Sequence, residues 1–409
     1  VDKSSAETAV RGMYRSLAPD GYYGLTFPAI GYLSGDNVQW TGSQSIVQQF
    51  ITHNVRADNA YIGNAWSAIY VTINRANHIL AKVPAVNDPL FAQDLRDQLT
   101  GEAYFVRALA YFDLARTWGG VQITLEPTES ASGKNGIKRS TLAQTYAQVL
   151  SDLNAAEPLL PETTNRFRAT KKTVWALKTR YYLYQQEWAL AEEYATKVID
   201  DAANYQLVQP YSAWFANNVV ATPESVFELS YSATYTNGHR NQWQPPANGG
   251  TRQWAPADQL ITQLNDAAVG GNRNAIIATT SAGLWYGNLY YRSPATDPAY
   301  VIRLAELYLA RAEARAQQNK LTEAAADLDA VRSRAGLPGT TASDKGELLL
   351  AVEAERKLEF PFEPHRWFDL VRTGRAAAVL GVTNVDKYLL PIPAADVLID
   401  PSLDQNTGY

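Results

Sequence analysis

The sequence predicts a mainly α-helical protein with four helix pairs of tetratricopeptide-like spacing, together with loop-rich segments that hold a few short β-strands. Three observations lead to this prediction. Apolar residues recur at helical spacing through most of the chain. Two distant segments repeat one pattern, and the segments between the helices are rich in turn-forming residues.

The helices are predicted from stripes of apolar residues. Val10, Met13 and Leu17 are spaced by three and four positions, which places them on one face of a helix. A later stripe must end at Pro158, because proline lacks the backbone N–H that continues a helix. The predicted pairs are 4–17 with 60–82, 92–118 with 140–157, 171–186 with 188–201, and 300–318 with 321–335.

The last two pairs repeat each other. The apolar positions of 188–198 match those of 321–331 at a constant offset of 133 residues, with the small Ala191 and Ala324 at equivalent places. Small residues at these positions let two helices approach closely, as in tetratricopeptide repeats. Because tandem repeats of that kind recur about every 34 residues, we expect repeats that are dispersed along this chain.

Residues 18–58 and 204–298 lack this periodicity and are rich in Gly, Pro, Asn, Ser and Thr. Short apolar runs inside them, such as 225–229, are typical of β-strands. Several tryptophans also lie in these segments, and disordered segments rarely hold so many aromatic residues. We therefore expect ordered binding loops. Among these tryptophans, the candidates for such loops are Trp40, Trp243, Trp254 and Trp285.

Composition excludes several classes of protein. The chain of 409 residues has no cysteine, which excludes thiol catalysis, cysteine-ligated zinc and disulfides. A net charge of −5 argues against a nucleic-acid partner, and the basic cluster over 166–180 is interpreted as a solvated helix face. No apolar run approaches the roughly 18 residues of a membrane span. The chain starts at Val1, which indicates a processed mature form.

The sequence offers little for catalysis. The common phosphate-binding, zinc-protease and serine-hydrolase motifs are absent, and the four histidines have no ligand-like spacing, so no cofactor or metal is predicted. A glycosidase would need two carboxylates in a cleft. The best candidates are Glu355, Glu359 and Asp369, but their aromatic and arginine neighbours favour a buried ionic network that joins two helices.

Ligand binding is the stronger hypothesis. An aromatic ring can stack on the C–H face of a sugar while polar neighbours bind its hydroxyls. Residues 285–292 and 36–40 combine both kinds of side chain. The predicted ligand-binding residues are Asp36, Trp40, Trp243, Trp254, Trp285, Tyr286, Asn288, Tyr290 and Arg292. Five other tryptophans lie on helical stripes and are predicted to be core, namely Trp66, Trp118, Trp175, Trp188 and Trp367.

Several motifs, in this order, resemble those of the SusD/RagB family of nutrient-binding lipoproteins. A Trp-x-x-x-Tyr helix with Ala-Asn spans 66–77, and Ala-x-x-x-Arg-Ala spans 103–108. Arg-x-x-Glu spans 303–306, and Leu-Pro-Ile-Pro at 390–393 precedes a Gln-Asn-x-Gly-Tyr terminus. The sequence departs from the family pattern at Pro364 and Thr407, and the chain is shorter than most family members.

The resemblance implies one SusD-like domain over 1–409, with a helical scaffold at 4–201 and 300–335 that packs against a loop-rich ligand-binding module at 204–298. The C-terminal family signature covers 347–409. It further implies a non-catalytic protein that binds a glycan or related nutrient at the outer surface of the outer membrane. Its anchor would be an N-terminal lipid, and its partner a SusC-like TonB-dependent receptor. A tetratricopeptide-like peptide-binding scaffold and an α-helical glycoside hydrolase are the alternatives.

Overall fold

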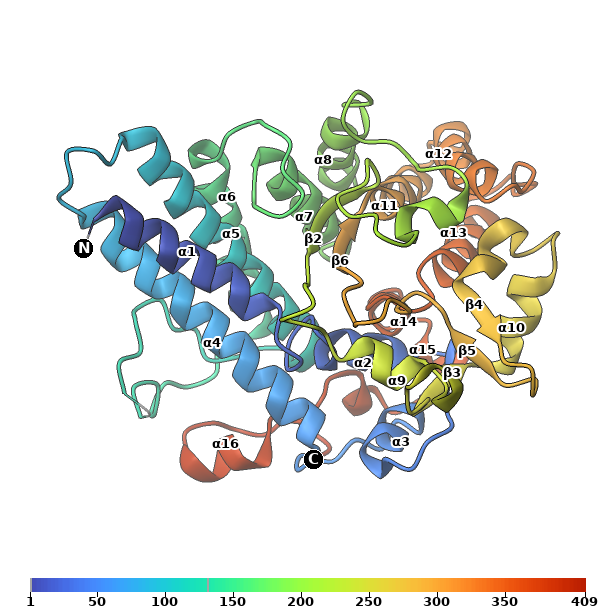
Figure 1. Ribbon diagram of the computed structural model, residues 1–409, viewed down its shortest axis with the longest axis horizontal. Coiled ribbons are helices and arrows are strands. Elements are labelled where there is room, and N and C mark those ends of the chain that lie inside the picture. Colours follow the sequence, from blue (N-terminus) through green and yellow to red (C-terminus); the bar gives the residue numbers. More distant parts are fainter. Residues whose placement is uncertain (1, 131) are drawn as a thin grey trace. The chain divides into compact units, whose positions relative to one another are not determined.

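The computed structural model describes residues 2–130 and 132–409 and is mainly helical (Figure 1). The chain divides into two compact units, and each unit combines segments that are distant in sequence. The first unit comprises residues 1–27, 54–174 and 382–409, and the second comprises 28–53 and 175–381. Helices α2 (Thr26–Leu33) and α7 (Lys171–Tyr184) include positions where the chain passes from one unit to the other.

Long helices that lie side by side form the first unit (Figure 1). Side-chain caps begin three of them, with Asp2 on α1, Asn59 on α4 and Thr141 on α6 accepting hydrogen bonds from otherwise unpaired backbone N–H groups. Its α-helices are α1 (Lys3–Leu17), α4 (Ala60–Lys82), α5 (Gln93–Trp118), α6 (Leu142–Ala156) and α16 (Ala394–Ile399). Its short 3₁₀ helices are Val83–Ala85, Glu157–Leu159 and Val385–Tyr388.

Most helices of the second unit are shorter. They are α3 (Ser45–Ile51), α8 (Trp188–Ile199), α9 (His239–Trp243), α10 (Asp258–Asn265), α11 (Leu304–Gln317), α12 (Leu321–Arg334), α13 (Lys345–Glu359), α14 (Arg366–Arg372) and α15 (Ala376–Leu380). Its 3₁₀ helices are Tyr211–Phe215, Pro246–Asn248 and Gly271–Ile276. Leu309, Leu328 and Val352 bring α11, α12 and α13 together in one fully buried core.

Three of the four predicted helix pairs pack as expected, α1–α4, α5–α6 and α11–α12, and the helices of the fourth, α7 and α8, are present and touch where Tyr182 stacks on Tyr194 at a centroid distance of 5.6 Å. The repeat at an offset of 133 residues extends to the backbone of the turns. Gln186 and Asn319 occupy equivalent positions and both have a φ of 59°, in the left-handed region. The following N–H groups, of Glu187 and Lys320, each donate to a carbonyl five residues earlier. The two pairs are therefore one structural motif used twice.

The few short strands expected from the sequence form antiparallel pairs. Strand β1 (Val38–Trp40) pairs with β3 (Trp254–Pro256), so that Trp40 lies opposite Trp254. Strand β2 (Ser225–Leu229), predicted from the sequence, pairs with β6 (Ala299–Arg303), and β4 (Ile277–Thr279) pairs with β5 (Trp285–Gly287). The β1–β3 and β2–β6 pairs join segments that are distant in sequence, by 217 residues in the case of Gln39 and Pro256, whereas β4 and β5 are neighbours along the chain.

Three expectations are wrong in detail. The helix predicted from residue 300 begins at Leu304, because residues 300–303 pair with β2 instead. Residues 18–58, expected to be irregular, include helices α2 and α3. Among the tryptophans assigned to the core, Trp175 and Trp188 are partly exposed: Trp188 is the first residue of α8, and the charged Nζ of Lys197 lies 5.7 Å from the centroid of the Trp175 ring.

In the first unit, hydrogen bonds join the two C-terminal sequence motifs, Leu-Pro-Ile-Pro and Gln-Asn-x-Gly-Tyr. Asn406 donates to the carbonyls of Trp118 and Leu390 at 3.0 and 2.7 Å. Gln405 donates to the carbonyl of Ile392 and accepts from its N–H. The Gln-Asn motif therefore supplies hydrogen-bond partners to the backbone of the Pro-Ile-Pro turn. The turn needs them because its prolines have no N–H groups to donate.

Replacing Asn406 with alanine should lower the free energy of unfolding by about 1–3 kcal/mol, since the Leu390 carbonyl loses its donor, the Trp118 carbonyl keeps only Arg139, and Arg139 loses the Asn406 oxygen as an acceptor. Urea denaturation followed by circular dichroism measures this change. Asn87→Ala is the matched control, because that side chain is exposed and has no hydrogen-bond partner in the part of the chain that the structure describes. Equal stability of the two variants would contradict the proposed role of Asn406.

Candidate functional site

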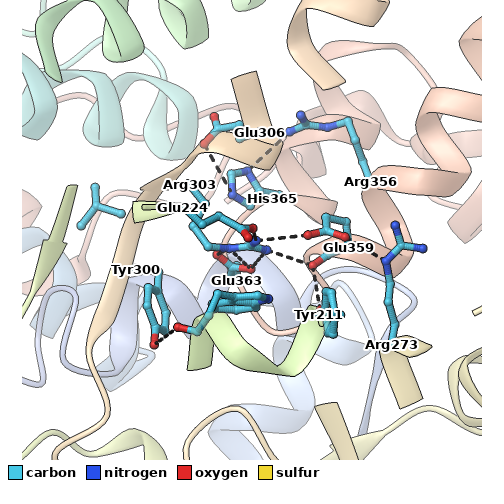
Figure 2. Close-up of polar contacts among 12 residues, drawn as sticks. Tyr211, Glu224, Arg273, Tyr300, Arg303, Glu306, Arg356, Glu359, Glu363 and His365 are labelled. Carbon is cyan, nitrogen blue, oxygen red and sulfur yellow. Dashed lines mark hydrogen bonds and ion pairs between the residues drawn. The ribbon is translucent and has the colours of Figure 1, made fainter. Parts of the chain in front are cut away.

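The charged residues of the sequence motifs form a buried ionic cluster in the second unit (Figure 2). Arg303 lies at its centre, 1% exposed at the side chain, and donates to Glu224, Glu359 and Glu363 at 2.6, 3.1 and 2.6 Å. Its guanidinium also lies 3.9 Å from the centroid of the Trp214 ring. The cluster thus connects β2, β6 and α13, as expected for a buried charge that must be paired.

Glu359 is the most heavily paired carboxylate of this cluster. It is completely buried and accepts from Arg273, Arg303 and Arg334. Burial by itself would raise the pKa of Glu359, but the charges of Arg334, Arg273 and Arg303 outweigh burial and lower it to about 2. A carboxylate with such a pKa stays ionised at neutral pH and is a poor proton donor.

The other two carboxylates considered for catalysis are similarly occupied. Glu355 pairs with Arg273 and with Arg332. Asp369 accepts from Arg356 and Arg372 at 2.7 and 2.9 Å; although burial opposes ionisation, these arginines lower the pKa of Asp369. The buried network predicted from the sequence is therefore present, and it holds α13 and α14 together.

The predicted ligand-binding residues are divided between the surface and the interior. Trp40, Trp285, Tyr286 and Asn288 are partly exposed. Trp40 ends β1, and Trp285 begins β5, which contacts β3.

Arg252 ties these two strand ends to each other. Its Nε donates to the carbonyl of Trp285 at 2.8 Å, and its own carbonyl accepts from the Thr41 hydroxyl at 2.8 Å. Its φ of 42° lies in the left-handed region, so this turn imposes an uncommon backbone conformation on a residue with a long side chain. We call the partly exposed residues at and beside these strand ends, Trp40, Arg252, Trp285, Tyr286 and Asn288, the aromatic edge. Arg252 was not predicted from the sequence, because its role depends on contacts with two other segments, through the Thr41 hydroxyl and the Trp285 carbonyl.

Trp243 and Trp254 lie inside the second unit, 1% and 0% exposed. Their rings pack edge to face at a centroid distance of 5.9 Å, and Tyr32 contacts both. The Trp243 ring also fills the space beside Gly287, where a Cβ would approach it to 2.5 Å. Neither ring is therefore accessible to a ligand, and both belong to the core of the second unit.

Tyr290, Arg292 and Asp36 also have structural partners. Tyr290 is 2% exposed and stacks on His239 at 4.1 Å, and Arg292 donates to the carbonyls of Ala216 and Val219. Asp36 accepts from Arg366 at 2.6 Å and pairs with Lys357 at 3.2 Å. Burial opposes its charge, but these two cations lower the pKa of Asp36. Of the nine predicted residues, the partly exposed and uncommitted ones are those of the aromatic edge.

Neither a metal centre nor a membrane helix is found in residues 2–130 and 132–409. Histidine and carboxylate side chains do not gather there in groups that could hold a metal ion. His53 bonds to the carbonyl of Ser34 at 2.8 Å and stacks on Trp367. Within the same residues, each helix is too short or too polar to cross a bilayer.

Comparison with known proteins identifies relatives over nearly the whole chain. A family model described as "SusD family" matches residues 115–384, and one described as "Starch-binding associating with outer membrane" matches residues 9–183. A SusD-like protein of Formosa agariphila is 27% identical, over 99% of this chain and 90% of its own length. The starch-binding protein SusD of Bacteroides thetaiotaomicron is 26% identical, over 82% of this chain and 76% of its own length.

Solved structures share the fold. A laminarin-binding SusD-like protein superposes with a TM-score of 0.86 over 100% of both chains, at 24% identity. A SusD superfamily protein of Bacteroides vulgatus gives 0.89 at 20% identity, over 100% of this chain and 99% of that one. The surface glycan-binding protein A of Bacteroides fluxus gives 0.83 at 19% identity, again over 100% and 99%.

Proposed function

Because the chain belongs to the SusD family, we propose that it binds a glycan at the outer membrane without cleaving it and delivers the glycan to a SusC-like TonB-dependent receptor. The observation that carries the proposal is the aromatic edge. Partly exposed Trp40 and Trp285 lie at strand ends joined through Arg252. Such a surface combines stacking faces with a cationic hydrogen-bond donor, which suits a ligand with C–H faces and many hydroxyls.

Relatives support the choice of a glycan. One solved relative is described as laminarin-binding, another as a surface glycan-binding protein, and one curated relative as starch-binding. The buried and paired state of Glu355, Glu359 and Asp369 supports binding without hydrolysis. A peptide-binding scaffold is less well supported, because the matched helix pairs are dispersed instead of consecutive.

The expected location is the outer surface of the outer membrane, with an N-terminal lipid as the anchor. The match to a family described as associating with the outer membrane supports this location. A receptor that also contacts the chain would add a second attachment to that of the lipid and prolong the stay of the chain at the bilayer. Native protein extracted in mild detergent should therefore co-purify with a β-barrel receptor.

Native gels that contain laminarin or starch test binding directly. We expect slower migration in at least one of these gels than in a glycan-free gel, because bound polymer retards the protein. Incubation with the retarding polymer should release no new reducing ends. Unchanged migration over a wider panel of neutral and charged polysaccharides would reject glycan binding, and new reducing ends would reject the non-catalytic proposal.

A further inference from the structure

A cavity of about 330 Å³ lies in the second unit among α7, α8, α11, α13 and α14, and none of its lining residues belongs to the aromatic edge. Ligand sites in proteins enclose about 300–1,000 Å³, so this volume suits a ligand of one or two rings. Its apolar lining includes the partly exposed Trp188 and Leu349 and the exposed Leu350. The Trp188 indole therefore supplies a stacking face together with an N–H donor.

The charged side chains that line the cavity form ion pairs with one another. Arg372 pairs with Glu313 at 2.7 Å and with Asp369 at 2.9 Å, and Arg356 pairs with Asp369 at 2.7 Å. A further pair, Arg375 with Glu353 at 2.8 Å, lies at a more exposed position. The lining thus holds three arginines and three carboxylates, and each charge already has a partner. A charged ligand would find no spare counter-charge here, whereas a neutral polar ligand meets no such penalty.

Uncommitted hydrogen-bonding groups line the same cavity as Trp188. The side-chain amides of Gln186 and Gln317 have no protein partner among the residues that the structure describes. Within those same residues, Arg375 uses only its Nε, for Glu353, and both of its Nη groups remain available. Each amide can donate and accept, which matches a hydroxyl that does both.

We propose that this cavity is a second saccharide site, which binds one or two rings of a neutral sugar. The ring stacks on Trp188, and its hydroxyls bind Gln186, Gln317 and Arg375. An entirely apolar ligand would leave these polar groups without water or partners, and an ionic ligand would disturb the balanced pairs. The ligand class follows from the cavity itself and is independent of where the polymer binds.

Two positions with the same backbone conformation allow a variant and a matched control. Gln186 and its repeat equivalent Asn319 both have a φ of 59°, which glycine adopts without strain. Gln186→Gly therefore removes the amide without straining the fold, and Asn319→Gly makes the same backbone change outside the cavity lining. Both variants should melt at or above the temperature of the unmodified chain. Any difference in sugar binding then reports the Gln186 side chain.

The probe sugars are maltose, cellobiose and laminaribiose, titrated into the whole chain labelled with 5-fluorotryptophan. Trp188→Phe identifies the fluorine signal of Trp188. We expect at least one disaccharide to shift this signal saturably. Gln186→Gly should weaken the affinity about fivefold, the loss of about one hydrogen bond, and Asn319→Gly should leave it unchanged. Glucuronic acid and glucosamine, which carry charge, should bind more weakly than the disaccharide.

Absence of a shift with all three disaccharides would overturn the proposal. Tighter binding of glucuronic acid or glucosamine, or equal weakening by both glycine variants, would also overturn it. Trp40→Ala/Trp285→Ala should retain the Trp188 shift while losing retardation in polysaccharide gels. A chain that is retarded in those gels yet shows no Trp188 shift would reject this second site and leave the proposed function standing.

Discussion

Replacing Glu359 with glutamine is expected to destabilise the protein by about 3–5 kcal/mol at neutral pH, the usual cost of breaking a buried ionic network. The reason is that Arg273, Arg303 and Arg334 would share one negative charge fewer in a completely buried site. Urea denaturation followed by circular dichroism at pH 7 provides the measurement. Loss of the native fold would be the extreme form of this result.

Glu193→Gln is the control for the same chemical change at the surface. Its partner is Lys197, and the two side chains are 53% and 36% exposed. Such a pair contributes about 0–1 kcal/mol, so the control should unfold almost as the unmodified chain does. If Glu359→Gln were as stable as this control, the cluster would not hold the second unit together.

The stability that Glu359 contributes should fall as the pH is lowered. The pKa of Glu359 is about 2 in the folded chain, below the roughly 4.3 of an unfolded glutamate. Its contribution to stability is therefore complete above pH 4.3 and is lost as the pH falls toward 2. Between pH 5 and pH 2 the unmodified chain should lose on the order of 3 kcal/mol more than Glu359→Gln. Parallel losses would show that Glu359 has an ordinary pKa.

The double variant Trp40→Ala/Trp285→Ala should weaken polysaccharide binding about a hundredfold. Each partly exposed ring can cover roughly 60 Å² of a sugar, worth about 1.5 kcal/mol at about 25 cal/mol per Å². That amount is slightly more than tenfold in affinity for each ring. The migration shift in gels with graded concentrations of the retarding polymer measures the change.

Trp175→Ala controls for the loss of a tryptophan as such, since Trp175 is partly exposed but lies on α7, which contributes no residue to the aromatic edge. It should bind as the unmodified chain does. Urea denaturation of each variant separates lost binding from lost folding. Retention of full affinity by a folded double variant would move the polymer site elsewhere.

The local sequence pattern was sufficient to predict the helices but not to predict which residues form the ligand site. The stripe through Val10, Met13 and Leu17 depends only on neighbours along one helix, and it gave α1 within one residue. Residues 300–303 were predicted to be helical but belong to β6, because this strand exists only through its pairing with the distant β2. Trp254 and Trp285 both resembled exposed loop tryptophans, yet pairing buries the first and leaves the second partly exposed.

The sequence by itself determined the helix pairs, the repeat at an offset of 133 residues and the family, because periodicity and ordered motifs are written in one dimension. Only the tertiary structure decided which side chains remain free for a ligand. Arg252 became part of the aromatic edge through the Trp285 carbonyl in β5 and the Thr41 hydroxyl after β1, and Asp36 left the candidate site by pairing with Arg366. Exposure and pairing depend on which distant segments meet, and a residue's type and immediate neighbours do not specify that.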